Sequence, residues 1–143
     1  VDPTNIVVLG RSLGTYFTVA LASSRALRAA ILATPFDSIA AVGAERYPWL
    51  PLGLMLNGRY DAAVMAPKIK IPALFVLAEN DDVTPVENGT ALARAWGGPQ
   101  RTVTLTGARH YGIERRPEFW SVVTEFLREV DSLPTPRETY ASH

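Results

Sequence analysis

Short apolar runs alternate with segments of helical character along this chain, and that alternation restricts the fold more than any other feature. The runs are rich in aliphatic and β-branched residues, which is typical of strands buried on both faces of a parallel sheet. They lie at residues 5–9 (NIVVL), 28–32 (RAAIL), 73–77 (ALFVL) and 102–105 (TVTL). Because helical segments separate them, we expect an α/β fold with a parallel sheet of about four strands flanked by helices.

The segment after the first run predicts a helix packed on that sheet. Its apolar residues Phe17, Ala20 and Leu21 recur at helical spacing, with Ser24 one turn further on. We expect this face of the helix to contact the sheet.

Two later helices carry start signals. In TPVE, Thr84 fits an N-cap, Pro85 the first helical position and Glu87 the capping-box partner, and the glycine pair at residues 97–98 ends the helix. Pro117 opens the other helix. Its predicted apolar stripe consists of Phe119, Val122, Val123, Phe126, Leu127 and Val130.

Between residues 36 and 70 the alternation breaks down, because prolines and glycines interrupt any long element. We interpret residues 36–70 as a small cap-like insertion over the sheet, within a partial domain of residues 1–130 that precedes a flexible tail at 131–143. Bulky apolar residues in the insertion are candidates to line an acyl pocket, although core packing explains them equally well. They are Phe36, Tyr47, Trp49 and Leu50.

The motif GRSLG joins the first apolar run to the first helical segment. A sharp turn between strand and helix pushes the Ser12 oxygen away from the backbone, and close packing there favours glycine at Gly10 and Gly14. The N–H of Leu13 would then point toward an oxyanion formed at Ser12. Ser12 is therefore a candidate nucleophile, and the alternative is a parallel-sheet protein whose glycine turn only saves space.

Two further groups suited to catalysis follow later strands. Asp81 and Asp82 come after the third run, and His110 comes after the fourth. Because parallel strands end at the same edge of a sheet, we expect these groups to lie near Ser12. A serine nucleophile needs an imidazole base, and the imidazole needs a carboxylate that fixes its tautomer. Taken singly, Asp81 fits an Asx-turn and His110 a solvated loop residue, but their common edge and chain order favour a triad.

Several motifs resemble the second half of an α/β-hydrolase, similar to the lysophospholipase-like and prolyl-oligopeptidase-like branches of that superfamily. They are GRSLG after one strand, DDVTP after a later one, GARH after the next, and the segment RYDAAVMAPKIKIPALFVLAEN before DDVTP. The resemblance implies that Ser12 is the nucleophile, His110 the base and Leu13 one oxyanion donor. It also implies that Asp81 rather than Asp82 is the acid, because the acid of these branches lies four residues before a proline.

The resemblance runs from about residue 5 to residue 127, but a complete member would have about four strands before the nucleophile strand. A loop after the third strand of such a member supplies a second oxyanion N–H, and loss of one such donor typically lowers the rate about 10²–10³-fold. The apolar strand from Ile6 to Leu9 would also lack a neighbour on one side, and such an edge pairs readily with another chain. We therefore expect either a piece of a larger protein or a dimer or partner chain bound at this edge.

Composition argues against several other functions. The 143 residues include 14 Lys+Arg and 14 Asp+Glu, so a net charge of zero gives no attraction to nucleic acid. With no Cys and two His, neither a metal site nor a cofactor is expected. No apolar run is long enough to span a membrane, and a cytoplasmic location is expected if no leader precedes Val1.

Two classes of function remain open. The first is a serine hydrolase that acts on a small-molecule ester, thioester or amide through an acyl-enzyme, either as a fragment of a full enzyme or completed by a partner chain. The second is a non-catalytic α/β module that associates through its exposed strand and keeps the triad as a remnant. A phosphate or nucleotide binder has little support, since the sequence contains neither a P-loop motif nor GxGxxG.

Overall fold

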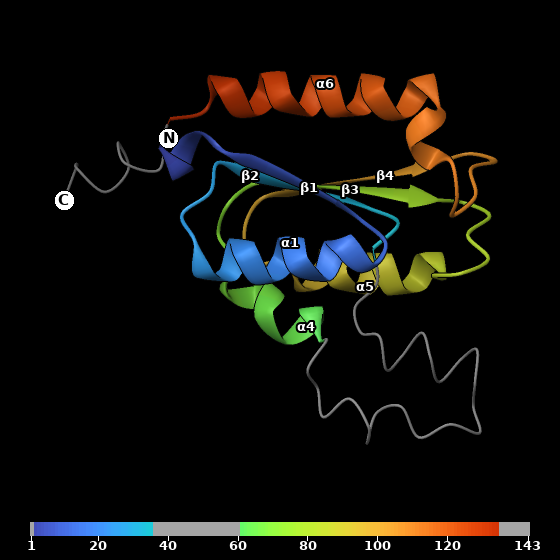
Figure 1. Cartoon of the computed structure of the whole chain (residues 1–143), viewed down its shortest axis with the longest axis horizontal. Helices are drawn as coiled ribbons and strands as arrows, with labels where there is room; N and C mark the ends of the chain where they lie inside the picture. Colours follow the sequence, from blue (N-terminus) through green and yellow to red (C-terminus); the bar gives the residue numbers. More distant parts are fainter. Residues whose placement is uncertain (1, 36–60, 135–143) are drawn as a thin grey trace.

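The computed structural model describes residues 2–35 and 61–134, which form a parallel four-stranded sheet between two layers of helices (Figure 1). In spatial order the strands are β1 (Val7–Arg11), β2 (Ala29–Ala33), β3 (Ala73–Ala78) and β4 (Gln100–Leu105). All three neighbouring pairs within this sheet are parallel. The α/β class expected from the sequence is confirmed.

Helices cover both faces of the sheet (Figure 1). One face carries α1 (Leu13–Ser24), α4 (Ala62–Met65) and α5 (Val86–Ala95), and the other carries α6 (Pro117–Ser132). Short 3-10 segments occupy η1 (Pro3–Asn5), η2 (Ala66–Lys68) and η3 (Ile113–Arg115).

Two hydrophobic cores lie on the two faces of the sheet, because alternate residues of a strand point to opposite sides. Leu32 and Phe75 belong to the core beneath α1 and α5, whereas Ile31 and Val76 belong to the core beneath α6. Every residue of β2 and β3 is buried, as expected for central strands covered on both faces.

The first strand begins later than the sequence indicated. Residues 5–9 were the expected strand, but Asn5 belongs to η1, whose first turn is capped by a hydrogen bond from the Thr4 N–H to the Asp2 carboxylate at 3.0 Å. The second strand also begins one residue late, since Arg28 precedes it. The Arg28 guanidinium is buried and donates to the Leu133 carbonyl oxygen at the end of α6 at 2.6 Å.

The predicted contact face of α1 was wrong. Phe17 and Leu21 were expected against the sheet, but their side chains are 59% and 41% exposed. The buried side of α1 instead carries small and β-branched residues, because the helix lies too close to the sheet for bulky side chains. These residues are Thr15, Thr18, Val19 and Ala22.

The later helices differ from expectation at their ends. The backbone of Pro85 is extended, with φ −50° and ψ 142°, so α5 begins at Val86 and Thr84 is not its N-cap. Helix α6 begins at Pro117 as predicted and continues to Ser132, two residues into the expected tail at 131–143.

Strand β1 is less buried than its composition suggested. Val7 and Val8 are half-buried and Leu9 is 47% exposed. Within the described residues β1 pairs with β2 alone, so its other edge carries backbone donors and acceptors that no described strand uses.

Candidate active site

Ser12 lies at the turn between β1 and α1 in a backbone conformation that residues other than glycine rarely adopt. Its φ is 50° and its ψ is −121°. Neighbouring main chain holds this turn, because the Ser12 N–H donates to the Ala33 carbonyl oxygen of β2 at 3.0 Å. The Ser12 carbonyl oxygen accepts from the Thr15 N–H at 2.9 Å and from the Thr15 hydroxyl at 2.6 Å. The turn therefore presents the Ser12 side chain at the carboxyl edge of the sheet.

The two motif glycines have different roles. A Cβ at Gly10 would lie 2.5 Å from the Gly14 carbonyl oxygen and would also overlap the Thr18 hydroxyl, so the close approach of β1 and α1 requires glycine there. At Gly14 an added Cβ would meet nothing within 4 Å. The expectation that close packing also favours glycine at Gly14 was wrong, because a side chain there would point into open space.

The side chains of Ser12, His110 and Asp81 meet at this edge. The His110 Nε2 lies 2.9 Å from the Ser12 Oγ. On the other side of the ring, Nδ1 lies 3.0 Å from each carboxylate oxygen of Asp81. The imidazole and the carboxylate are both 2% exposed, so the pair is almost fully removed from solvent.

These contacts determine the hydrogen positions on the imidazole. An ionised carboxylate only accepts hydrogen bonds, so the hydrogen of a neutral His110 ring is assigned to Nδ1. The lone pair of Nε2 then faces the Ser12 hydroxyl and accepts its hydrogen bond. The geometry thus suits transfer of a proton from serine to histidine while the carboxylate stabilises the resulting imidazolium.

Two hydrogen bonds join the loops that carry Asp81 and His110. The Asn80 N–H, next to Asp81, donates to the Ala108 carbonyl oxygen at 2.8 Å. The Gly107 N–H donates to the Glu79 carboxylate at 2.7 Å, three residues before His110. Because both loops leave neighbouring strands β3 and β4, these bonds fix the separation of Asp81 and His110.

Comparison with known proteins agrees with this geometry. Residues 1–129 match the protein family described as serine hydrolase. The chain belongs to the serine hydrolase family. It is 37% identical over 110 residues to an uncharacterised protein of Mycobacterium tuberculosis, found in strains H37Rv and CDC 1551. That match covers 77% of this serine hydrolase chain and 39% of the relative, so the chain spans about two fifths of the length of the curated relatives it matches.

Solved structures share the fold of this chain. Acetyl xylan esterase 1 from Thermoanaerobacterium superposes with a TM-score of 0.73 at 18% identity, over 92% of this chain and 47% of that one. An α/β-hydrolase enzyme from a lagoon sediment metagenome gives 0.69 at 21%, over 90% and 64%. Dipeptidyl peptidase 4 from Porphyromonas gingivalis gives 0.71 at 22%, over 90% and 20%. These likenesses show the fold. Together with the serine hydrolase family match they confirm the α/β-hydrolase resemblance, but they do not single out the branches to which the sequence motifs are similar.

Hydrogen bonds hold the carboxyl group of Asp81 in its charged form. Burial of this group raises its pKa, but the hydrogen bond with His110 and those from the Val83 and Thr84 N–H groups lower it by more. The two N–H groups donate to Oδ1 at 2.9 and 2.7 Å. The pKa of Asp81 therefore lies below its ordinary value.

The lowered pKa of Asp81 predicts a loss of stability in acid. A carboxyl group whose pKa is lower in the folded chain stabilises the fold above its unfolded pKa, and the contribution disappears as pH falls through the folded pKa. We expect the free energy of unfolding to decline below about pH 4 less steeply in Asp81→Asn than in the wild type. Urea titrations between pH 2 and pH 7 measure this, with Asp82→Asn as the matched control. Equal acid dependence in Asp81→Asn and wild type would contradict the assignment.

Two side chains next to Asp81 and His110 were not predicted from the sequence. Thr84, interpreted as a helix cap, instead contacts both Asp81 and His110. Arg11, the second residue of GRSLG, donates to the His110 carbonyl oxygen at 3.3 Å and lies 5.9 Å from the centre of the Tyr111 ring. The position of Thr84, three residues after Asp81, could have indicated a contact between the two side chains. Nothing in the sequence indicated the direction of the Arg11 side chain.

The four residues expected to line an acyl pocket, Phe36, Tyr47, Trp49 and Leu50, lie outside the described residues. Within residues 2–35 and 61–134 no group of three or more His, Asp or Glu side chains is arranged to hold a metal ion. None of the helices in those ranges is both long and apolar enough to cross a membrane.

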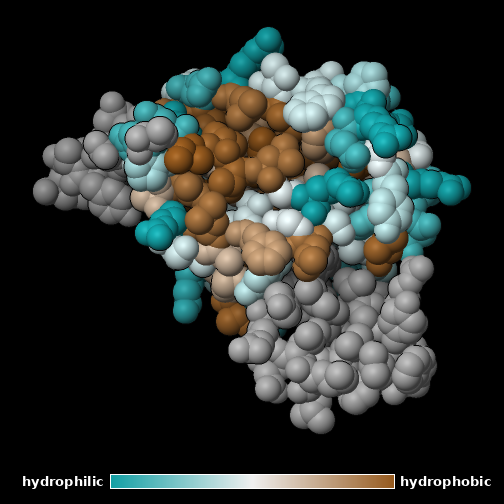
Figure 2. Space-filling model, viewed as in Figure 1, coloured by the Kyte–Doolittle hydropathy of each residue, from teal (hydrophilic) through white to brown (hydrophobic). Residues whose placement is uncertain are grey.

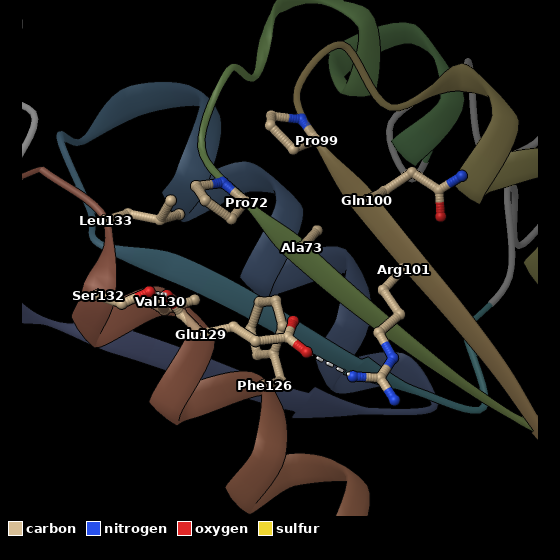
Figure 3. Close-up of a pocket in the computed structure, with 10 residues that line it drawn as sticks. All are labelled: Pro72, Ala73, Pro99, Gln100, Arg101, Phe126, Glu129, Val130, Ser132 and Leu133. Carbon is tan, nitrogen blue, oxygen red and sulfur yellow. Dashed lines mark hydrogen bonds and ion pairs between the residues drawn. The ribbon is translucent and has the colours of Figure 1, made fainter.

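A pocket of about 270 Å³ lies at the opposite end of the sheet (Figure 3). It is bounded by the beginnings of β3 and β4 and by the end of α6, and Arg101 pairs there with Glu125 and Glu129 at 2.8 Å each. Because Ser12 follows the carboxyl end of β1, this pocket is separate from the triad.

Proposed function

We propose that this chain carries the catalytic triad of a serine hydrolase that cleaves a small-molecule ester, thioester or amide through an acyl-enzyme. The observation that supports the proposal best is the 2.9 Å contact between the Ser12 Oγ and a His110 ring whose other nitrogen faces the buried Asp81 carboxylate. In this assignment Ser12 is the nucleophile, His110 the general base and Asp81 the acid that orients the base.

The reaction proceeds in two halves. The Ser12 Oγ bonds to the substrate carbonyl carbon while its proton passes to the His110 Nε2. The imidazolium returns that proton to the leaving oxygen, sulfur or nitrogen as its bond to carbon breaks, which leaves the acyl group on Ser12. Water then repeats the sequence with His110 as base, and releases the acid and free Ser12.

The N–H of Leu13 is the proposed oxyanion donor on this chain. Leu13 is the first residue of α1, so its N–H has no acceptor within the helix, and it follows the nucleophile directly. A donor at this position stabilises the negative charge that develops on the substrate oxygen. We assign the second donor of the oxyanion hole to polypeptide outside the described residues, on the β1 side of the sheet.

Burst kinetics test this function. With p-nitrophenyl acetate in excess, acyl-enzyme formation releases up to one equivalent of p-nitrophenol per active chain before a slower steady phase. We expect this burst in the wild type and not in Ser12→Ala. Hydrolysis at the same rate in both proteins, or none above buffer in either, would contradict the proposal.

A second function, association through the open edge of β1, is favoured by the surface around that strand. Figure 2 shows apolar side chains gathered on this face, over β1 and between α6 and α1. The exposed members at β1 and α1 are Ile6, Leu9, Leu13, Phe17 and Leu21, with exposures from 37% to 59%. A contiguous apolar surface next to the open edge of a strand is a typical interface. Because the matched relatives are longer, we propose that in them further polypeptide covers it, and that a second copy covers it when this chain is alone.

Charged substitutions on this surface are expected to dissociate the assembly. Leu9→Lys places an ammonium group in the apolar contact, so sedimentation of the chain expressed alone should shift from dimer or larger species toward monomer. Leu9 is preferred to Val7 for this test, because Val7 also packs against the core beneath α6 and its substitution would lower stability as well. Val64→Lys, at a residue of α4 that is 66% exposed, is the matched control. A monomeric wild-type chain with a cooperative melt would contradict the association.

A further inference from the structure

The hydroxyl of Thr84 lies within the triad rather than at the end of a helix. Thr84 is 4% exposed, and its Oγ1 donates to the Asp81 Oδ2 at 2.9 Å. The same oxygen lies 3.1 Å from the His110 Nδ1 and 3.4 Å from the Thr34 carbonyl oxygen. One buried side chain therefore contacts both the acid and the base.

The single proton of this hydroxyl has a preferred acceptor. A hydroxyl offers one hydrogen and two lone pairs, and the carboxylate is both nearer and a stronger acceptor than the Thr34 carbonyl. With the proton directed to Oδ2, a lone pair of Oγ1 faces Nδ1. That arrangement suits a ring with its hydrogen on Nδ1, which is the tautomer whose Nε2 accepts from Ser12.

The two oxygens of the Asp81 carboxylate are held by different donors. Oδ1 accepts from the Val83 and Thr84 N–H groups as well as from the ring. Within the described residues, the donors to Oδ2 are the ring and the Thr84 hydroxyl. Without that hydroxyl the ring alone would hold Oδ2, so the plane of the carboxylate and the direction of the ring would be less restricted.

We propose that Thr84 is a positioning residue of this hydrolytic site: its hydroxyl holds the Asp81 carboxylate and, through it, keeps His110 in the reactive tautomer. The inference rests on the proposed function. Because the hydroxyl acts on the acid and the base rather than on substrate, its loss lowers kcat and leaves KM unchanged.

Thr84→Val tests the hydroxyl with little change in shape. We expect the second-order rate of Ser12 labelling by a fluorophosphonate to fall about 10-fold, the scale of one hydrogen bond to a charged group. The downfield proton NMR signal of the His110 Nδ1–H is expected to shift or broaden at the same time. Thr84→Ser, which restores the hydroxyl, should recover most of the rate and the signal. Thr90→Val in α5 removes a hydroxyl that donates to the Val86 carbonyl oxygen at 2.9 Å, and it should match the wild type.

Three outcomes decide the matter. A folded Thr84→Val protein with the wild-type labelling rate and an unchanged Nδ1–H signal would overturn the proposal. If Thr84→Val fails to melt cooperatively, the labelling rates of Thr84→Ala and Thr84→Ser test the same proposal, because these two variants also differ in the hydroxyl. If the wild type itself is not labelled, the proposed function fails, and the Nδ1–H signal of the variants still decides whether Thr84 positions the ring.

Discussion

Ser12→Ala and His110→Ala are each expected to lower kcat/KM for an activated ester by at least about 10⁴-fold, because each removes one end of the same proton transfer. The Oγ and Nε2 atoms lie 2.9 Å apart, within the distance for direct proton transfer. Initial rates with p-nitrophenyl acetate measure the effect, with Ser23→Ala on the exposed end of α1 as the control for loss of a serine hydroxyl.

The double variant distinguishes a shared mechanism from two independent contributions. When two groups act in the same step, removal of either one already abolishes the contribution of both. The kcat/KM of the double variant Ser12→Ala, His110→Ala should therefore be little lower than that of either single variant. Losses that multiply would mean that the two side chains act separately. That result would be inconsistent with a nucleophile activated by this histidine.

Gly10→Ala is expected to have the largest effect on stability among single substitutions in GRSLG. The new methyl group would lie 2.5 Å from the Gly14 carbonyl oxygen, so strand β1 and helix α1 would have to separate. We expect the free energy of unfolding to fall by about 2–4 kcal/mol, in line with other overpacked sites. Because Ser12 lies between the two elements, labelling of Ser12 should fall as well.

Gly14→Ala is the matched control for this substitution. It adds the same methyl group four residues away, in open space on a helix. Alanine is the better helix former, so the free energy of unfolding should be unchanged or rise by up to about 1 kcal/mol. Urea unfolding of both variants tests the pair. Equal destabilisation of the two would show that the close approach at Gly10 is not what holds the turn.

The convergence of Ser12, Asp81 and His110 was predictable from the sequence because it follows from a simple rule of sheet topology. Parallel strands end at one edge, so polar groups that follow different strands converge without any knowledge of their detailed conformations. Ser12 directly follows β1, whereas Asp81 and His110 lie in the loops that follow β3 and β4, and the structure places the three side chains in contact. Their catalytic roles remain a proposal, whereas their convergence is a geometric result.

Features that depend on distances between elements were not predictable from one sequence. The spacing of Phe17 and Leu21 indicated a helix correctly, but the face that contacts the sheet was decided by how closely α1 approaches β1. Threonine is a common helix N-cap, so the sequence favoured that role for Thr84. Only the three-dimensional position of the Asp81 carboxylate shows that the Thr84 hydroxyl donates to it. In both cases tertiary packing, rather than the local preference of the residue, decides what the side chain contacts.

Mass mapping after reaction with a fluorophosphonate tests the central claim most directly. An activated serine forms a stable phosphonyl adduct, whereas an ordinary serine hydroxyl is a weak nucleophile. The account predicts one adduct per chain, on the tryptic peptide that contains Ser12, and its loss in His110→Ala. An unmodified Ser12 in the folded wild-type chain, or an adduct that forms equally fast without His110, would contradict it.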